Sequence, residues 1–119
     1  MRTKYQQPLV EGCFYHIYNR AVSKARLFYT EDNYDYFMHN WQKYLSPYCD
    51  LLAYCLIPNH FHFVVRIKPI DEQIIEAIKT NSTRASVSFL EGQNEYYQFL
   101  EAQFQRFFLA HALAIRKQE

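Results

Sequence analysis

The sequence predicts an α+β fold in which helices cover one face of a small antiparallel sheet. Three short stretches are rich in aromatic and β-branched residues, as strands are, and two longer stretches repeat their apolar residues at helical spacing. The chain of 119 residues is large enough for one hydrophobic core but not for two. We therefore expect a single domain over residues 1–119.

The first strand is expected over residues 13–18, whose side chains are mostly aromatic or β-branched. Because side chains alternate between the faces of a strand, His16 shares one face with Phe14 and Tyr18. A polar loop rich in positive charge is expected to follow over residues 19–26.

The first helix is expected over about residues 31–45. Thr30 is a suitable N-cap, and Glu31 and Asp32 place negative charge where the helix dipole favours it. The helix must end before Pro47. Its apolar stripe, which we interpret as a core face and not as a cofactor site, consists of Tyr34, Phe37, Met38, Trp41 and Leu45.

Residues 50–57 predict a well-buried second strand, and Pro58-Asn59 predicts the turn of an antiparallel hairpin. The third strand follows at once and alternates regularly, so His60 and His62 lie on the same face. One face of this strand carries His60, His62, Val64 and Arg66, and the other carries Phe61, Phe63, Val65 and Ile67.

Two further helices are expected after the third strand. Asp71 caps a short one with three isoleucines, and the clearest helix of the chain runs over about residues 95–117. Residues 80–94 between them show no clear pattern, and Gly92 is the strongest break. His111 lies on the apolar stripe of the long helix and is interpreted as a histidine at the edge of the core. The stripe comprises Leu100, Phe104, Phe107, Phe108, His111 and Ile115.

The order strand, helix, strand, strand, helix is the βαββα start of a ferredoxin-like α+β sandwich that lacks its last strand. In such a layered fold the helices cover one face of the sheet. Phe61 and Phe63 would then pack against the helices. His60 and His62 would point to the uncovered side, where a purely structural role for them is harder to sustain.

Composition limits the class of protein. The formal net charge of +1 does not by itself indicate a nucleic-acid-binding protein, so any such role must come from a local patch. Cys13, Cys49 and Cys55 are odd in number and lack Cys-x-x-Cys spacing, and no signal peptide is recognisable. We expect reduced thiols in or near the core, a cytoplasmic location and no membrane span.

The His-x-His pair suggests a metal site. Two neutral imidazoles on one face can hold a divalent cation, and a cation there can polarise a phosphate. The alternative is that His60 and His62 are half-buried and form hydrogen bonds with the backbone or water. If the metal site is real, the expected contacts to phosphate are Arg20, Lys24, Arg26 and Arg66.

Three stretches together resemble a known family. They are residues 15–20 (Tyr-His-Ile-Tyr-Asn-Arg), residues 52–66 (Leu-Ala-Tyr-Cys-Leu-Ile-Pro-Asn-His-Phe-His-Phe-Val-Val-Arg) and residues 103–108 (Gln-Phe-Gln-Arg-Phe-Phe). They resemble the IS200/IS605-like Y1 transposases, and within these the REP-associated tyrosine transposases. The resemblance covers about residues 13–117, and its central motif is far more specific than a bare His-x-His.

The resemblance implies an HUH-type (His–hydrophobic–His) endonuclease and strand transferase acting on single-stranded DNA beside hairpins. Such proteins have a ferredoxin-like core and usually work as dimers. His60 and His62 would bind Mg²⁺ or Mn²⁺ with a further polar ligand. A tyrosine hydroxyl would attack the scissile phosphate, giving a 5′-phosphotyrosine link and a free 3′-hydroxyl. This link conserves the phosphodiester energy, so rejoining needs no ATP.

One part of the family pattern is not found. In the family the nucleophilic tyrosine and the third metal ligand lie on a further helix, after a Gly-Ser-Leu-Phe-like strand, and this sequence stops at Glu119, before both. The resemblance therefore implies a nucleophile beyond Glu119, and Tyr96 and Tyr97 are poor substitutes for it. The chain is expected to be a fragment, a domesticated remnant that binds DNA without cutting it, or one half of a split system. A missing strand would leave a sheet edge unpaired, which favours a homodimer or a partner chain.

Three alternatives use the same residues differently. A non-enzymatic nucleic-acid-binding module would use Tyr18 to stack bases and the basic loop to follow phosphates. A cupin-like metalloenzyme requires a Glu shortly after the second histidine and a Gly-rich barrel, whereas this chain has two glycines and no such Glu. A zinc site built from Cys55, His60 and His62 is conceivable, but Cys55 precedes the turn.

Overall fold

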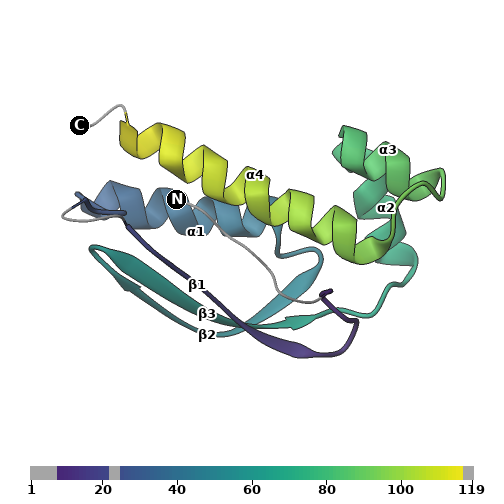
Figure 1. The fold of residues 1–119 in the computed structure, drawn as a ribbon, viewed down its shortest axis with the longest axis horizontal. Helices are drawn as coiled ribbons and strands as arrows, with labels where there is room; N and C mark the ends of the chain where they lie inside the picture. Colours follow the sequence, from purple (N-terminus) through teal and green to yellow (C-terminus); the bar gives the residue numbers. More distant parts are fainter. Residues whose placement is uncertain (1–7, 22–24, 117–119) are drawn as a thin grey trace.

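The computed structural model describes residues 8–21 and 25–116. They form an α+β fold with a three-stranded antiparallel sheet in the order β1-β3-β2. Figure 1 shows the helices on one side of this sheet, with α1 and α4 lying along it and α2 and α3 at one end. The predicted fold class is confirmed at this level. The elements are β1 (Phe14–Arg20), α1 (Glu31–Tyr44), β2 (Cys49–Ile57), β3 (His60–Ile67), α2 (Glu72–Asn81), α3 (Arg84–Leu90) and α4 (Tyr96–Arg116).

The central strand β3 pairs with both neighbours, and the turn at Pro58-Asn59 joins it to β2 as predicted. Strand β1 is longer than its sequence indicates. Asn19 and Arg20, expected in a loop, continue the strand opposite Phe61 and His60. The extension is a tertiary effect. The backbone groups at this end of β3 need hydrogen-bond partners, and local sequence preference does not reveal that Asn19 and Arg20 supply them.

The helices begin where their capping residues stand. Thr30 caps α1 in a capping box with Asn33, and the Asp71 carboxylate accepts a hydrogen bond from the Ile74 N–H of α2 at 2.8 Å. Helix α3 lies in the stretch that showed no clear pattern. A second capping box with Thr83 starts it, and its few apolar residues are too short a run to display helical spacing.

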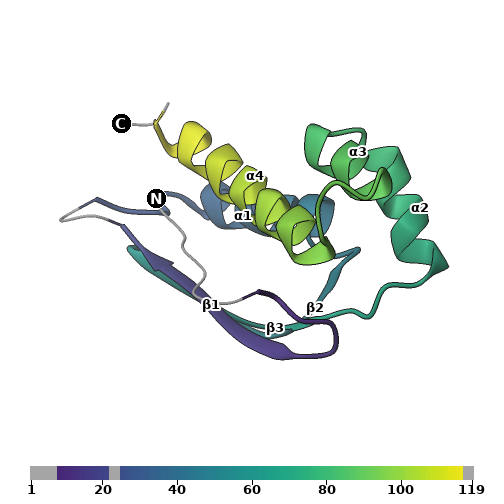
Figure 2. The ribbon, with the colours of Figure 1, turned by 45° about the vertical axis from the view of Figure 1, so that its right-hand side comes forward.

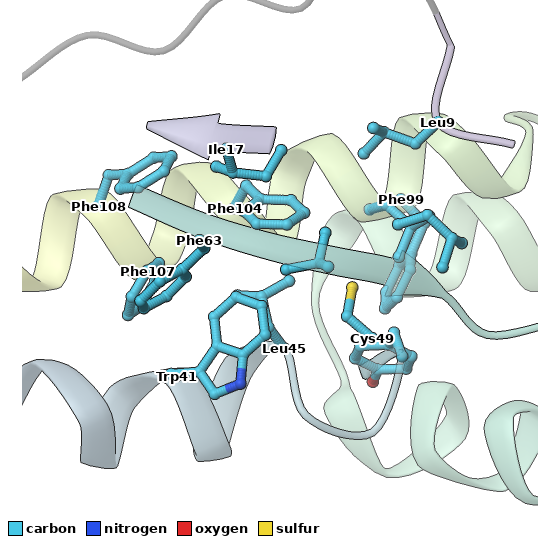
Figure 3. Close-up of a cluster of buried hydrophobic side chains, with 14 of the residues drawn as sticks. Leu9, Ile17, Trp41, Leu45, Cys49, Phe63, Phe99, Phe104, Phe107 and Phe108 are labelled. Carbon is cyan, nitrogen blue, oxygen red and sulfur yellow. The ribbon is translucent and has the colours of Figure 1, made fainter. Parts of the chain in front are cut away.

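The core lies between the sheet and the helices. Figure 3 shows Phe63 of β3 among Trp41 of α1 and Phe104 and Phe107 of α4, so the sheet and the two helices pack together through aromatic rings. The rings of Trp41 and Phe63 are 4.9 Å apart between centroids and nearly perpendicular. The apolar stripes of α1 and α4 therefore face the sheet, with Phe37, Trp41 and Phe107 in ring contact with Phe63. Figure 2, a turned view, shows both helices on the same side of the sheet.

The cysteines only partly match expectation. Cys49 is buried, and burial raises the pKa of its thiol to about 12. Cys13 and Cys55 are exposed, so the prediction that all three lie in or near the core is wrong for these two. Cys55 alternates onto the side of β2 that carries no helices. Among the described residues no helix is long and apolar enough to cross a membrane.

His111 lies deep in the core rather than at its edge. It is 1% exposed, its Nε2–H donates to the Leu27 carbonyl oxygen at 2.6 Å, and its ring packs against Phe28 and Phe37. Its Nδ1 has no hydrogen-bond partner among the described residues. Burial lowers the pKa of His111, and the Leu27 hydrogen bond acts in the opposite direction. The ring is thus a neutral core group and not a ligand.

This burial predicts a stability loss in mild acid. Below about pH 6.5 the unfolded chain binds a proton at His111 that the folded protein does not bind. The free energy of unfolding should therefore fall as the pH drops below that value and recover above it. Urea unfolding of the wild type and of His111→Gln, at several pH values between about 7 and 5, tests this. The wild type should lose more stability than the non-titrating variant, and parallel curves would contradict the assignment.

Candidate functional site

The candidate site lies on the side of the sheet that turns away from the helices, which we term the open face. Directly opposite residues of an antiparallel pair share a face. The β1–β3–β2 register therefore sets Tyr18, His62 and Cys55 in one row across the open face. The adjacent row places Arg20 beside His60. The alternating burial of β3 shows the same arrangement, with the phenylalanines buried and the histidines partly exposed.

The rings of His60 and His62 lie side by side. Their centroids are 5.1 Å apart and their planes are nearly perpendicular, at 88°. His60 Nδ1 lies 2.7 Å from the side-chain oxygen of Asn59, which can only accept a hydrogen bond. Nδ1 of His60 is therefore the protonated nitrogen, and the lone pair of the neutral ring is on Nε2. This is the form in which an imidazole binds a metal.

A third imidazole completes the cluster. His16 Nε2 lies 2.8 Å from His62 Nδ1, and the two rings are close to parallel, with centroids 5.0 Å apart. Tyr18 packs against His16 at 4.7 Å between centroids. Sequence reasoning placed His16 on the same face as Tyr18 but did not assign it to the site. The alternation along β1 indicates which face carries His16. The register between β1 and β3, which places His16 beside His62, cannot be deduced from the sequence of strands so far apart in the chain.

The surroundings of His60 favour its neutral form. The pKa of His60 is lowered first by desolvation and then by the positive charge of Arg20 and by His62. Metal ligation requires the deprotonated ring, so this shift keeps His60 ready to act as a ligand at neutral pH. Arg20, which alternation places on the open face, is thus both a cause of the shift and a cation available to a phosphate.

The other residues predicted to contact phosphate do not gather around the two histidines as Arg20 does. Arg66 also belongs to the open face, but its guanidinium pairs with Asp50 at 3.3 Å. Arg26 is exposed in the connection before α1, and Lys24 lies outside the described residues. Two large aromatic side chains of β1 add to the open face, Phe14 and Tyr18, which are 61% and 62% exposed. Around the histidines, the structure therefore brings together Arg20 and Tyr18.

The side chains near His60 and His62 can be examined for their ability to hold a metal ion. In residues 8–21 and 25–116, no group of three or more His, Cys, Asp or Glu side chains is arranged to hold one. A zinc site closed by Cys55 therefore finds no support, although Cys55 lies opposite His62. Mg²⁺ and Mn²⁺ prefer oxygen ligands, and Mg²⁺ keeps several of its waters, so two imidazole nitrogens would supply only part of the coordination shell and water or phosphate oxygen the rest.

No described tyrosine is placed as an evident nucleophile. Tyr96 is 8% exposed at the start of α4, packs against Phe99 and has a pKa raised by burial. Tyr97 is half-buried on the same helix. Tyr18 is close to the histidines, but its ring is stacked on His62 at an interplanar angle of 23°. The exposed ring of Tyr18 is suited to stacking on a base.

The nucleophile implied by the family resemblance would follow Glu119, the last residue of the sequence. Glu119 itself, with residues 117 and 118, lies outside the described residues, which end at Arg116 in α4. The position that the resemblance implies for this tyrosine thus lies outside the described residues, and a nucleophile beyond Glu119 stays a prediction.

A shallow groove elsewhere on the molecule involves neither His16 nor His60 nor His62. Its volume is about 570 Å³, and it lies between α1 and the edge strand β2, with Asp35, His39, Trp41 and Lys68 among its lining residues.

Comparison with known proteins adds no assignment. No family model matches the chain, and neither a curated protein nor a solved structure shows significant similarity to it.

Proposed function

We propose that the chain is an HUH-type domain that binds single-stranded DNA and processes it with a divalent metal, as the IS200/IS605-like Y1 transposases do. The observation that carries the proposal is the pair of adjacent imidazoles on the open face, His60 and His62, with Arg20 and Tyr18 beside them. His60 and His62 would hold Mg²⁺ or Mn²⁺. The ion, when bound, supplies Lewis-acid polarisation of a phosphate oxygen.

The residues around the ion have separate tasks. Arg20 contributes positive charge next to His60, where a phosphate would develop negative charge. Tyr18 offers an exposed ring on which a base can stack. A helical duplex shields the faces of its bases by stacking, so an exposed ring on a sheet favours single-stranded DNA or the end of a hairpin.

We assign the fold to the ferredoxin-like type within this proposal. Its support is the order of β1, α1, β2 and β3 together with helices on one face. Strands β1 and β2 are the edges of the described sheet. An edge strand presents unpaired backbone groups, so either one can accept a strand from a second copy or a partner chain. A homodimer or a complex of this kind is part of the proposal.

A second candidate function is a module that binds hairpin DNA and does not cut it. The exposed ring of Tyr18 favours it, because an exposed aromatic ring on a sheet serves base stacking and needs no cleavage chemistry. In the first function the nucleophilic tyrosine would have to come from outside the described residues. Both functions use the same open face, so they share their DNA contacts.

One experiment separates the two. The protein is mixed with Mn²⁺ and either a hairpin-bearing single strand or a fully paired duplex, and binding is followed by fluorescence anisotropy. A denaturing gel then detects any covalent adduct. Preference for the single strand with an adduct supports the transferase. The same preference without an adduct supports binding without cleavage by this chain, because the first function then needs a tyrosine supplied from outside it. Equal or negligible binding of both DNAs would contradict both functions.

A point variant tests the base-stacking role. Tyr18→Ala should weaken binding of the single strand by about 1–3 kcal/mol, the usual contribution of one aromatic stacking platform. Tyr36→Ala is the control, since Tyr36 is also an exposed tyrosine but lies on α1. Anisotropy titrations at fixed salt give both affinities. Unchanged binding by Tyr18→Ala would remove Tyr18 from the DNA interface.

A further inference from the structure

The hydrogen bonds at the Nδ1 atoms of His60 and His62 differ in one respect. His60 meets the Asn59 side-chain oxygen, which accepts and never donates. His62 meets the Nε2 of His16, a ring nitrogen that can do either. The tautomer of His60 is therefore fixed by its neighbour, whereas that of His62 depends on which ring donates.

Two neutral arrangements satisfy the contact between His16 and His62. In the first, Nδ1–H of His62 donates to Nε2 of His16, and the lone pair of His62 is on its outer nitrogen, Nε2. In the second, Nε2–H of His16 donates to Nδ1 of His62, and the outer nitrogen of His62 then carries a proton. Only the first arrangement lets His62 bind an ion beside His60.

We propose that His16 is a positioning residue for the metal site: it accepts the Nδ1–H of His62 and so holds that ring in its ligating tautomer. This inference rests on the proposed function, in which His60 and His62 are the ligands. It gives His62 what Asn59 gives His60, a partner at Nδ1 that orients the ring and makes its other nitrogen a better ligand.

The surroundings of His16 suit this task. The residue is exposed on β1, so the core does not depend on it. Its position is nevertheless defined, because β1 is paired with β3 along its whole length and Tyr18 packs on the ring. The 18° angle between the rings of His16 and His62 brings the two nitrogens edge to edge, as a hydrogen bond requires.

Mn²⁺ binding to the full chain, followed by electron paramagnetic resonance of the free ion, is the test. His16→Phe keeps a flat ring on Tyr18 but removes the acceptor, and it should weaken Mn²⁺ binding by about 10- to 100-fold. His16→Gln restores an acceptor and should retain most of the wild-type affinity. His39→Phe, the same change at an exposed histidine of α1, should bind as the wild type does.

Nitrogen-15 NMR of the histidine rings supplies a readout independent of affinity. In the Mg²⁺-loaded wild type and in His16→Gln, His62 should carry its proton on Nδ1. Wild-type affinity in His16→Phe would overturn the proposal, as would an equal loss in His16→Phe and His16→Gln, which would make His16 a direct ligand or a steric wedge. A proton on Nε2 of His62 in the loaded wild type would overturn it as well.

The failure of this inference can be told from failure of the proposed function. His60→Ala and His62→Ala are titrated with Mn²⁺ in the same series. If neither changes the affinity, the metal site itself is lost and His16 has nothing to position. If both abolish binding while His16→Phe does not, the metal site stands and only the role of His16 is wrong.

Discussion

Replacing Phe63 by alanine is expected to lower the free energy of unfolding by about 3–5 kcal/mol. The Phe63 side chain is 0% exposed and lies where sheet and helices meet, with the rings of Trp41, Phe37 and Phe107 around it. Removing the ring takes away its burial and leaves a cavity that these rigid neighbours cannot close. Urea unfolding followed by circular dichroism measures the change.

The adjacent residue of β3 provides the control for Phe63. Val64 points to the open face and is 38% exposed, so Val64→Ala should change stability by less than about 1 kcal/mol, the range of strand propensity. Similar losses for Phe63→Ala and Val64→Ala would contradict the assignment of the two faces of β3. That assignment determines on which side the histidines lie.

Removing either proposed ligand is expected to abolish Mn²⁺ binding and leave the fold intact. His62→Ala deletes one of only two protein nitrogens proposed to hold the ion, and His60→Ala deletes the other. Both side chains are partly exposed on the open face, so neither change opens a cavity in the core. Isothermal titration with Mn²⁺ gives the affinity, and a thermal melt gives the midpoint.

His39→Ala serves as the matched variant for the two ligand deletions, because His39 is exposed on α1 and faces away from the site. It should retain both Mn²⁺ affinity and melting temperature. If His60→Ala or His62→Ala instead unfolds the protein, these histidines are structural. Retained Mn²⁺ affinity in both would remove the metal from the proposal and leave DNA binding alone.

The sequence reveals the elements whose signal is local. The aromatic and β-branched residues of β1, the capping residues Thr30 and Asp71 and the turn at Pro58-Asn59 each act within a few positions, and each is found where it was expected. Helix α3 was not predicted, because a short helix rich in serine contributes few apolar residues to a periodic pattern.

Only the part of the candidate site that lies on a single strand could be predicted from the sequence. The common face of His60 and His62 follows from their spacing alone. The contact between His16 and His62 depends on the pairing of β1 with β3, and the pairing of Arg66 with Asp50 depends on that of β2 with β3. Register across strands is set by the whole core. The local sequence pattern therefore predicts neither the contact of His16 with His62 nor the ion pair of Arg66 with Asp50.

The strand order also has a consequence for how the site is assembled. The hairpin of β2 and β3 closes a short loop, whereas the contact between His16 and His62 joins residues 46 positions apart. Loop closure of that length carries a larger entropic penalty and slows folding. We expect β1 to dock after the hairpin and to detach before it. Transient loss of this strand would dismantle the imidazole cluster while most of the domain stays folded, and hydrogen exchange would register it as the earliest opening of the sheet.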